Sequence, residues 1–201
     1  VLLSDWSKAY SRVLDTNTLL ETNRNFVRAL QTKPLSRKMA YWRTKLAGVE
    51  QCHFPQLSDA STSSNCVATA TATATASIEI DGNDFESIQS FCKSQSVTPA
   101  SIFQSAWALL LSVYTGNSSV CFGYIASGRD LPVEGIEQSV NAYANMLICR
   151  SNISRTSTPH QFIQELHDQV LEDLDFQHCS LADIQHDLQF SSENPLFNTI
   201  V

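Results

Sequence analysis

Charge is scarce in this sequence, and long apolar runs are absent from it. Charged residues make up 16% of the 201 residues, and the net charge is −7. An acidic chain is a poor match for the phosphate backbone of nucleic acids and for an anionic lipid surface. No apolar run approaches the roughly 20 residues that a membrane helix needs, and no basic segment precedes an apolar one near the first residue. The sequence therefore predicts a soluble chain that binds neither nucleic acid nor membrane.

Closely spaced cysteines are absent as well. The six cysteines lie at positions 52, 66, 92, 121, 149 and 179, and no two of them form a CxxC pair. A disulfide framework or a zinc site favours tighter spacing. Cys92, Cys121 and Cys149 lie inside apolar segments, where free cysteine behaves as a small hydrophobic residue. We expect reduced thiols, no metal site and a cytoplasmic location.

The common motifs of cofactor and nucleophile sites are also missing. The sequence contains no GxGxxG, no phosphate-binding loop, no GxSxG and no HExxH. His160 and His167 lie two helical turns apart, which is too far for direct ligation of one ion. We expect both to be solvated or partly buried. Glu172, Asp173 and Asp175 are predicted to form a solvated acidic face, because no apolar pocket is implied around them.

Apolar residues recur with the helical period in several stretches. Residues 35–46 are predicted as a helix that turns Trp42 and Leu46 inward. Residues 100–114 follow Thr98-Pro99, which supply a cap and a first-turn proline. This segment is apolar nearly all round, and such a helix is expected to be buried on several sides.

Other helices are marked by residues that cap helix amino termini, at Asn83, Thr158 and Ser180. Residues 1–14 carry a helical stripe with no capping residue before it. Residues 195–201 form an apolar, strand-like run with no turn after it. We therefore expect both ends of the chain to be cuts through secondary structure.

Strand patterns occur at three places. Residues 68–80 alternate small or β-branched apolar residues with Thr, Ser and Glu, which predicts a strand in the second half of the segment. Residues 120–126 and 142–148 are short apolar runs typical of strands. Helices alternating with a few strands predict an α/β layered fold.

The loop between the two apolar runs carries the polar residues of greatest interest. Ser127, Gly128, Arg129 and Asp130 follow a predicted buried strand, and loops on rigid scaffolds often carry function. Arg129 and Asp130 either pair with each other and fix the loop or line a site. Asn145 is the polar residue of an otherwise apolar strand, so its amide either ties down neighbouring backbone or meets a ligand.

His178 is a further candidate, because it stands just before the helix cap Ser180. Two interpretations are open for it. It is either a hydrogen-bonded loop residue or part of a site.

Several ordered segments resemble nonribosomal peptide synthetase condensation domains. Residues 127–130 read SGRD, residues 135–137 read GIE, and Tyr143, Asn145 and Arg150 follow in the strand that carries an IGxFVNT-type segment in that family. Asn141 stands where the family usually has Gly, and Met146 where it has Thr.

Other family segments follow in the same order along the chain. Residues 41–48 (YWRTKLAG) resemble the YWxxxLAG helix, residues 176–181 resemble the HQxxPF-type loop, and residues 194–198 (NPLFN) resemble the SRNPLF strand, with Glu193 in place of Arg. The resemblance covers essentially the whole chain. The residues of these segments are similar to those of the fungal branch of the family.

The catalytic HHxxxDG of that family does not occur in this sequence, and Asp81-Gly82 has no histidine pair before it. In the family, HHxxxDG lies just ahead of a helix that resembles residues 1–14. The resemblance thus implies no catalytic residue within the chain, and we expect the catalytic histidine of HHxxxDG upstream of Val1.

The same resemblance implies that residues 1–201 are the C-terminal part of a condensation domain. Residues 1–50 would be the helices that follow the catalytic motif. Residues 66–201 would be an α/β lobe with a mixed sheet flanked by helices, similar to chloramphenicol acetyltransferase.

The function implied by the resemblance is amide-bond formation between a carrier-bound acyl or peptidyl thioester and an amine. The implied partners are carrier domains with their phosphopantetheine arms, the N-terminal lobe and adjacent synthetase domains; no directly bound cofactor is expected. The tunnel wall would include Ser127, Gly128, Arg129, Asp130, Tyr143 and Asn145, and His178 is a further candidate.

The 201 residues alone are expected to be inactive, because the proton-handling histidine is not among them. Three alternatives stay open. They are a terminal domain that releases its peptide by macrocyclisation, a noncatalytic lobe that binds carriers, and an acyltransferase that uses acyl-CoA.

Overall fold

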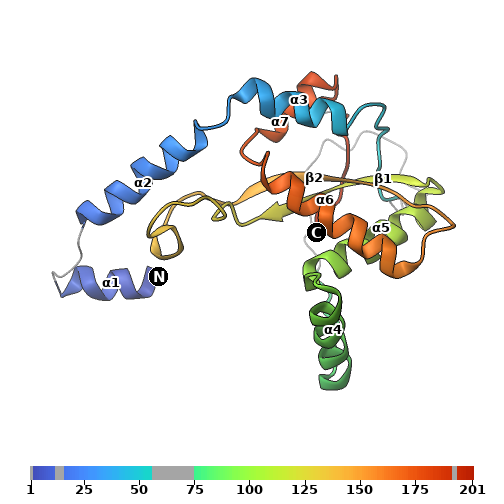
Figure 1. Cartoon of the computed structure of the whole chain (residues 1–201), viewed down its shortest axis with the longest axis horizontal. Coiled ribbons are helices and arrows are strands. Elements are labelled where there is room, and N and C mark those ends of the chain that lie inside the picture. The colour runs from blue at the N-terminus through green and yellow to red at the C-terminus, as the bar shows by residue number, and fades with distance from the viewer. Residues whose placement is uncertain (1, 12–15, 56–74, 192–193) are drawn as a thin grey trace, which may run out of the picture.

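The computed structural model describes residues 2–11, 16–55, 75–191 and 194–201. In chain order its elements are α1 (Leu2–Tyr10), α2 (Thr16–Leu30), α3 (Leu35–Lys45), α4 (Gly82–Gln95), α5 (Pro99–Thr115), β1 (Ser119–Ala126), the 3-10 helix η1 (Ile136–Gln138), β2 (Asn145–Asn152), α6 (Pro159–Leu174) and α7 (Leu181–Asp187). The strands cross the body of the molecule, α1 and α2 extend away from it, and α4 projects separately (Figure 1).

The sheet is built around β1. β1 and β2 pair in antiparallel fashion, with Ser119 opposite Asn152 and Ala126 opposite Asn145. On its other side β1 meets the last residues of the chain in parallel, where the Gly123 N–H donates to the Thr199 carbonyl (3.0 Å). Antiparallel and parallel pairing therefore meet in one small sheet, which confirms the predicted mixed sheet flanked by helices.

The main core lies between this sheet and the helices. Trp42 and Leu46 at the end of α3 are fully buried, as predicted. Together with them, the largest fully buried apolar side chains are Leu111, Val120, Phe122, Leu147, Ile148, Ile184 and Leu196. Burial of each such side chain contributes roughly 1.5–3 kcal/mol. The core thus fixes α3 against β1 and β2.

Helix α5 differs from its prediction. Thr98 caps it, Pro99 opens it and Gly116 ends it with φ +74°, all as the sequence indicates. Its buried face, however, consists mostly of small or polar residues, namely Ser101, Gln104, Ser105, Ala108 and Leu111. Larger apolar side chains on its other faces are exposed, and Val113 is 80% exposed. The expectation of burial on several sides is wrong, because small inward residues bring α5 close to α6 and leave the bulky ones outside.

Three local predictions need correction. Residues 75–80 form no strand, and Ile78 is 93% exposed. A strand needs a neighbouring ladder, and none pairs with these residues within the described segments; residues 68–74 lie outside them. The cap of α4 is Asp81, which accepts from the Asp84 N–H, and not Asn83. β2 begins at Asn145 rather than at residue 142.

The predicted stripe of α1 is also only partly confirmed. The helix forms, but Leu3, Trp6 and Tyr10 are 81%, 73% and 85% exposed. Periodicity sets which residues share a face, but burial of that face depends on what packs against it. Val1, which the prediction places at the start of this helix, lies outside the described residues.

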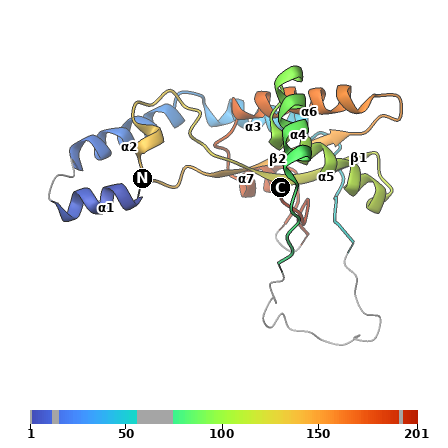
Figure 2. The ribbon, with the colours of Figure 1, turned by 90° about the horizontal axis from the view of Figure 1, so that it is seen from below.

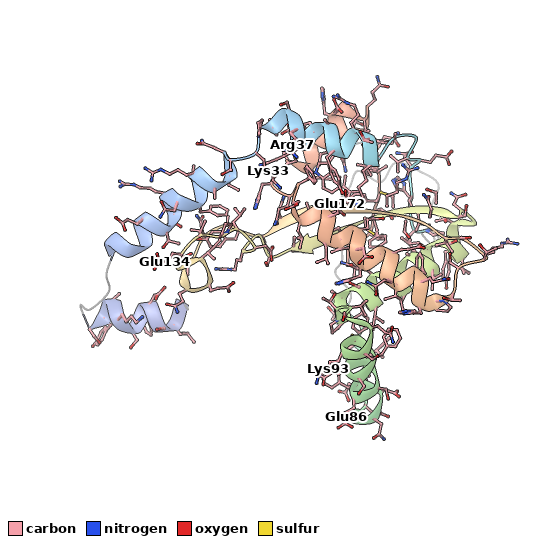
Figure 3. All side chains as sticks on the ribbon, in the orientation of Figure 1. Lys33, Arg37, Glu86, Lys93, Glu134 and Glu172 are labelled. Atoms are coloured by element: carbon pink, nitrogen blue, oxygen red, sulfur yellow. The ribbon has the colours of Figure 1, made fainter. Side chains whose placement is uncertain are left out.

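The long loop between β1 and β2 reaches toward α2, as both views show (Figures 1 and 2). Phe26 of α2 packs with Val133, Ile136 and Tyr143 in a second apolar cluster. The rings of Phe26 and Tyr143 meet edge to face at 4.7 Å. Glu134, which is labelled in Figure 3, lies near the tip of this loop beside α2. The loop thus connects the strands with α2. Together with α1, α2 forms the part of the molecule that we call the helical arm.

Among the described residues, no single helix is long and apolar enough to cross a membrane. Within the same segments, only α4 and α5 taken together reach that length and composition, and they are bent by 103° at their break.

Candidate functional site

Gly128 sets the path of the loop that follows β1. Its φ is +68°, and an added Cβ would lie 1.8 Å from the Tyr143 carbonyl oxygen. Only glycine adopts this backbone conformation readily and leaves room for so close an approach. The loop residues are therefore held directly against the residues that enter β2.

Arg129 closes the loop. Its guanidinium donates to the carbonyls of Ile136 and Ser139, the latter at 3.1 Å, and lies 4.5 Å from the centroid of the Tyr143 ring. The Ser127 hydroxyl accepts from the Arg129 N–H (3.3 Å). Such contacts order the loop without any ligand.

Asp130 does not pair with Arg129. Its carboxylate instead accepts from Gln177 Nε2 at 3.4 Å, across 47 residues of sequence. The alternative of an Arg129–Asp130 pair is therefore wrong, since the carbonyls of the loop occupy the guanidinium. Gln177 was not predicted as a site residue, although it belongs to the HQxxPF-like segment.

Asn145 ties down neighbouring backbone, which is one of the two alternatives that the sequence left open. Its Oδ1 accepts from the Met146 N–H (3.0 Å) and so ties down the start of β2. Its Nδ2 is buried and has no hydrogen-bond partner among the described residues. A buried donor without a partner costs about 1–3 kcal/mol, and an acceptor on a ligand would remove that cost.

His178 lies in a turn with left-handed backbone, at φ +66°. The ring meets Phe26 edge to face at 5.9 Å, and Nε2 is buried without a partner in the described part of the chain. Burial lowers the pKa of His178 from 6.5, and the nearby Lys38 lowers it further, while Asp130 opposes them. The imidazole is therefore neutral at pH 7.

Helix α3 positions this turn. Trp42 Nε1 donates to the Phe176 carbonyl at 3.1 Å, and the ring of Tyr41 stacks on the Phe176 ring at 3.9 Å. Lys33 donates to the Asp175 carbonyl (2.9 Å). Backbone and ring contacts at residues 175 and 176 thus fix the chain directly before residues 177 and 178.

Two cavities lie on either side of His178, which lines both together with Leu30. One, of about 280 Å³, is lined by Phe26, Tyr143 and Asn145 among others. The other, of about 320 Å³, is lined by residues that include Asp130 and Gln177. Through these cavities the structure brings together the predicted Tyr143, Asn145, Asp130 and His178.

Ser127, Gly128 and Arg129 are not among the residues that line either cavity. Their contacts hold the loop that carries Asp130 and Tyr143 to the cavities. Their predicted place in a tunnel wall stays a prediction.

The expected position of the catalytic histidine, upstream of Val1, also stays a prediction. The described residues begin at Leu2, so Val1 itself is outside them. The described segment that follows, α1, contains no histidine, and the side chains of its Leu3, Trp6 and Tyr10 are exposed.

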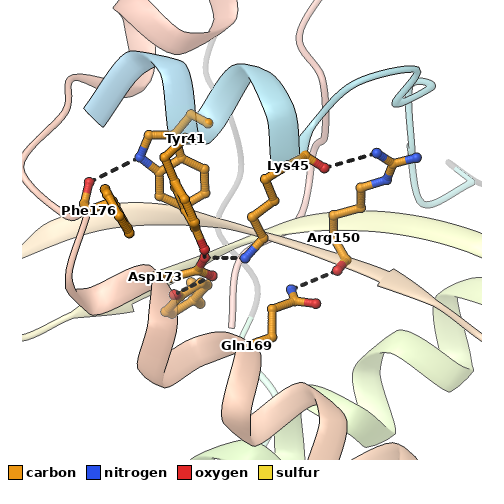
Figure 4. Close-up of polar contacts among 8 residues, drawn as sticks. Tyr41, Lys45, Arg150, Gln169, Asp173 and Phe176 are labelled. Atoms are coloured by element: carbon orange, nitrogen blue, oxygen red, sulfur yellow. Dashed lines mark hydrogen bonds and ion pairs between the residues drawn. The ribbon is translucent and has the colours of Figure 1, made fainter. Parts of the chain in front are cut away.

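A buried ionic cluster joins α3, α6 and β1 (Figure 4). Asp173 of α6 is fully buried and pairs with Lys45; it also accepts from the hydroxyls of Tyr41 (2.8 Å) and Tyr124 (3.1 Å). Burial raises the pKa of Asp173, although Lys45 and the hydroxyls oppose this shift. The prediction of a solvated acidic face is wrong for Asp173, because α3 and β1 cover it.

The spacing of Tyr41 and Lys45 in the sequence is consistent with this cluster. Residues four apart share one helix face, so the two side chains can reach one common partner. Among the other acidic residues of this stretch, Asp175 does fit the prediction, since it is 75% exposed and pairs with Lys33 at 3.2 Å.

The remaining histidines and cysteines offer no site in the described residues, and the expectation of a solvated or partly buried side chain is wrong for His167. His167 is buried and its Nδ1 lies 2.9 Å from the Ser101 hydroxyl, while His160 meets the ring of Phe91 edge to face. No group of metal-ligating side chains occurs in the described segments.

The thiols at positions 52, 92, 121, 149 and 179 are free and buried, and Cys66 lies outside the described residues. Burial raises the pKa of Cys149 to about 12 and also raises that of Cys121. A thiol that stays protonated is a weak nucleophile, so Cys121 and Cys149 act as core residues.

The fold resembles those of solved condensation domains. The first condensation domain of the calcium-dependent antibiotic synthetase matches with a TM-score of 0.68 and 14% identity, over 92% of this chain and 40% of that one. The EpoB cyclization-docking bidomain from Sorangium cellulosum matches with a TM-score of 0.67 and 16% identity, over 89% and 36%. These likenesses confirm the predicted chloramphenicol acetyltransferase-like fold.

Curated relatives share more sequence. Nonribosomal peptide synthetase 5 of Gibberella zeae is 35% identical over 200 residues, which is 100% of this chain and 2% of that protein. Nonribosomal peptide synthetase ungA of Aspergillus violaceofuscus is 33% identical over 177 residues, which is 88% and 2%. The chain thus spans a small fraction of these relatives.

The family model of the condensation domain matches residues 1–201, and the resemblance first seen in SGRD, YWRTKLAG and NPLF extends over the same range. Both agree with the fold. The chain belongs to the condensation-domain family.

Proposed function

We propose that this chain works as one part of a nonribosomal peptide synthetase condensation domain that joins a carrier-bound acyl or peptidyl thioester to an amine. The observation that carries the proposal is the pair of buried, unpartnered atoms Asn145 Nδ2 and His178 Nε2 on one cavity, in a chain of this family. Neither atom has a partner in the described part of the chain, which supports a contact with a substrate.

The chemistry explains why a donor is useful there. Attack of an amine on a thioester puts negative charge on the carbonyl oxygen, and a preorganised donor stabilises that charge. The Met146 N–H occupies Asn145 Oδ1, so Nδ2 is the atom left to donate to such an oxygen. Asn145 would thus bind the thioester carbonyl and orient it for attack.

A proton must also leave the attacking amine. The resemblance assigns this to a histidine of HHxxxDG, a motif that is absent from these 201 residues. His178 is neutral and lines the same cavity as Asn145, so in this proposal it shapes the wall and accepts or donates one hydrogen bond. The isolated 201 residues would therefore form no amide.

The proposed partners are carrier domains, the N-terminal lobe of the same domain and the adjacent synthetase domains. The carriers would deliver both substrates on phosphopantetheine arms. Such an arm has an apolar chain with amide groups, and the cavity beside Phe26 and Tyr143 offers apolar walls together with the Asn145 donor.

The test is amide formation by the full-length protein that carries this chain. Asn145→Asp keeps the side-chain shape and replaces the donor by an oxygen, so we expect kcat to fall by about 10²–10³-fold, as for loss of an oxyanion donor. Asn141→Asp changes an exposed amide of the same loop and is the control. Equal rates for Asn145→Asp and the unaltered protein would contradict the proposal.

The products of the same assay separate the remaining alternatives. A linear amide supports chain extension, and a cyclic product shows release by macrocyclisation. Absence of any product with intact carrier binding points to a noncatalytic lobe, and activity with acyl-CoA in place of a carrier points to a different acyltransferase.

A further inference from the structure

Another cavity lies apart from His178, between the end of β2 and one face of α6. Its volume is about 320 Å³, within the range of roughly 300–1,000 Å³ that small-molecule sites occupy. It shares no lining residue with the two cavities beside His178. Its wall consists of residues 150–152 of β2, Lys45 of α3 and residues of α6 that are spaced three and four apart and so share one face.

Arg150 brings to this cavity a positive charge that no described carboxylate balances. Its Nη1 donates to the carbonyls of Lys45 (3.0 Å) and Ala47 (2.7 Å) at the end of α3, as Figure 4 shows for Lys45. Its Nε is buried without a partner in the described part of the chain, and its Nη2 is not buried and has no described acceptor. Nε and Nη2 form the edge of a guanidinium that binds a carboxylate through two parallel hydrogen bonds. Arg150 therefore favours a carboxylate.

Glu165 brings the opposite charge. It is exposed, and it pairs with no cation in the described segments. It lies one helical turn before Gln169, whose Nε2 donates to the Arg150 carbonyl at 2.7 Å, so it belongs to the face of α6 that meets the end of β2. Lys45, the other cation of the wall, is already paired with the buried Asp173. The cavity thus contains one cation and one anion that do not pair with each other.

The same face of α6 adds an apolar surface to the cavity. Phe162 and Leu166 line it, and they are only 6% and 2% exposed. A ligand that fits the whole cavity therefore carries a carboxylate, a cationic group and a short apolar chain.

We infer that this cavity binds a free α-amino acid with an apolar side chain, whose carboxylate contacts Arg150 and whose ammonium contacts Glu165. A molecule with both charges is attracted by both residues, whereas Glu165 repels a simple anion and Arg150 repels a simple cation. The apolar side chain would lie against Phe162 and Leu166. This site is separate from the proposed function, so amide formation neither supports nor refutes it.

Photolabelling of the full-length protein locates the site. The probe is photo-leucine, an analogue of leucine that carries a diazirine in its side chain. After irradiation, peptide mapping should find the label within residues 159–169, because the diazirine would lie against Phe162 and Leu166. Amino acids bound elsewhere in the protein do not affect this readout, since it reports on one segment. Absence of label from this segment would overturn the inference.

Competition identifies the class of ligand. Leucine should suppress labelling of residues 159–169 at about tenfold lower concentration than 4-methylpentanoate, which lacks the ammonium, or 3-methylbutylamine, which lacks the carboxylate. A tenfold difference corresponds to the loss of one hydrogen bond between charged groups. Competition by either of these two compounds at the same concentration as leucine would refute the assignment of an amino acid.

Glu165→Gln tests the contact with the ammonium. It should bring the effective concentrations of leucine and 4-methylpentanoate together, because the remaining amide neither attracts the ammonium nor repels the carboxylate. Asp168→Asn is the matched control, since Asp168 is an exposed carboxylate of the same helix that does not line the cavity. A tenfold advantage of leucine that persists in Glu165→Gln contradicts the assigned contact.

Arg150→Lys tests the contact with the carboxylate. Lysine keeps the positive charge but lacks the planar edge with two donors, so labelling by photo-leucine should fall about tenfold. Arg155→Lys, at an exposed position after β2, should leave labelling unchanged. Equal labelling of Arg150→Lys and the unaltered protein would show that Arg150 does not bind the ligand. The competition among the three compounds in the unaltered protein decides the inference even if Arg150→Lys does not fold.

Discussion

At the scale of single residues, Gly128 is the position where the loop depends most on having no side chain. We expect Gly128→Ala to destabilise the protein by roughly 3 kcal/mol or more, because the new Cβ meets the Tyr143 carbonyl at 1.8 Å and the backbone stays at φ +68°. Urea unfolding gives the free energy. Gly116→Ala is the matched control, since Gly116 has φ +74° but nothing within 4 Å of its Cβ, and should cost only about 1–2 kcal/mol. Equal losses of unfolding free energy in the two variants would show that the loop shifts to accommodate the new Cβ.

His178 makes a pH-dependent contribution to stability. Its folded pKa lies below 6.5, so the unfolded chain takes up a proton at a higher pH than the folded one. The free energy of unfolding should therefore rise with pH through the window that ends near pH 6.5, and this contribution is lost as pH falls through the folded pKa. Lys38 and Asp130 are the charged groups that act on the ring.

The measurement is unfolding at a series of pH values for the unaltered protein and for His178→Asn, a polar residue that also tolerates positive φ. The difference between the two should shrink below pH 6.5 and stay constant above it. A difference that grows on acidification would mean that the histidine is protonated in the folded state.

At the scale of elements, the Lys45–Asp173 pair joins α3 to α6, and two hydroxyls complete it. Lys45→Met should cost about 3–5 kcal/mol, because it leaves a buried carboxylate without its counter-charge. Lys45→Met combined with Asp173→Asn removes both charges while Tyr41 and Tyr124 keep an acceptor. The double variant should therefore be more stable than Lys45→Met alone.

A double-mutant cycle in urea measures this coupling. Arg43 is the control on the same helix, because its pair with Asp187 is exposed, so Arg43→Met should change stability little. Additive effects of the Lys45 and Asp173 changes would show that the two charges do not depend on each other.

Sequence patterns predicted the elements whose signals are local. Thr158 caps α6 as predicted, and residues 120–126 lie in β1, because capping and short apolar runs depend on near neighbours. The alternation near Ile78 failed, since a strand also needs a partner that no local pattern specifies. The prediction that Asp173 is solvated was wrong for a similar reason. The residues that cover it come from α3 and β1, far away in sequence.

The sequence predicted several residues of the site, but not that the site consists of two cavities. Asn145 and His178 were identified as unusual polar residues, and both have an unpartnered atom in the structure. The Gln177–Asp130 contact spans 47 residues and was not foreseen. His178 lines both cavities, and only the folded arrangement of the turn at 177–178 shows this.

At the scale of the whole molecule, the connection between the helical arm and the strands depends on the apolar cluster around Phe26. The loop between β1 and β2 contacts α2 through this cluster and through Thr22, whose hydroxyl donates to the Glu134 carbonyl at 3.3 Å. The cavity beside Asn145 has walls from both sides of this contact, Phe26 from α2 and Tyr143 from the loop. The shape of the site therefore follows the docking of the loop on the arm.

We expect Phe26→Ala to release the loop from α2 and to leave the strand pair intact. Removing a buried Phe costs about 3–5 kcal/mol, and here that loss falls on the contact between loop and arm rather than on the main core. Hydrogen exchange should therefore become faster at Val133, Ser139 and Tyr143, whose N–H groups are bonded within the loop, while the amides of β1 and β2 keep their protection. Val27→Ala, a change at the adjacent residue that is 50% exposed, should leave both sets unchanged. If the strands lose protection together with the loop, the helical arm and the strands unfold as one cooperative unit. The cavity beside Asn145 then cannot open without unfolding of the whole chain.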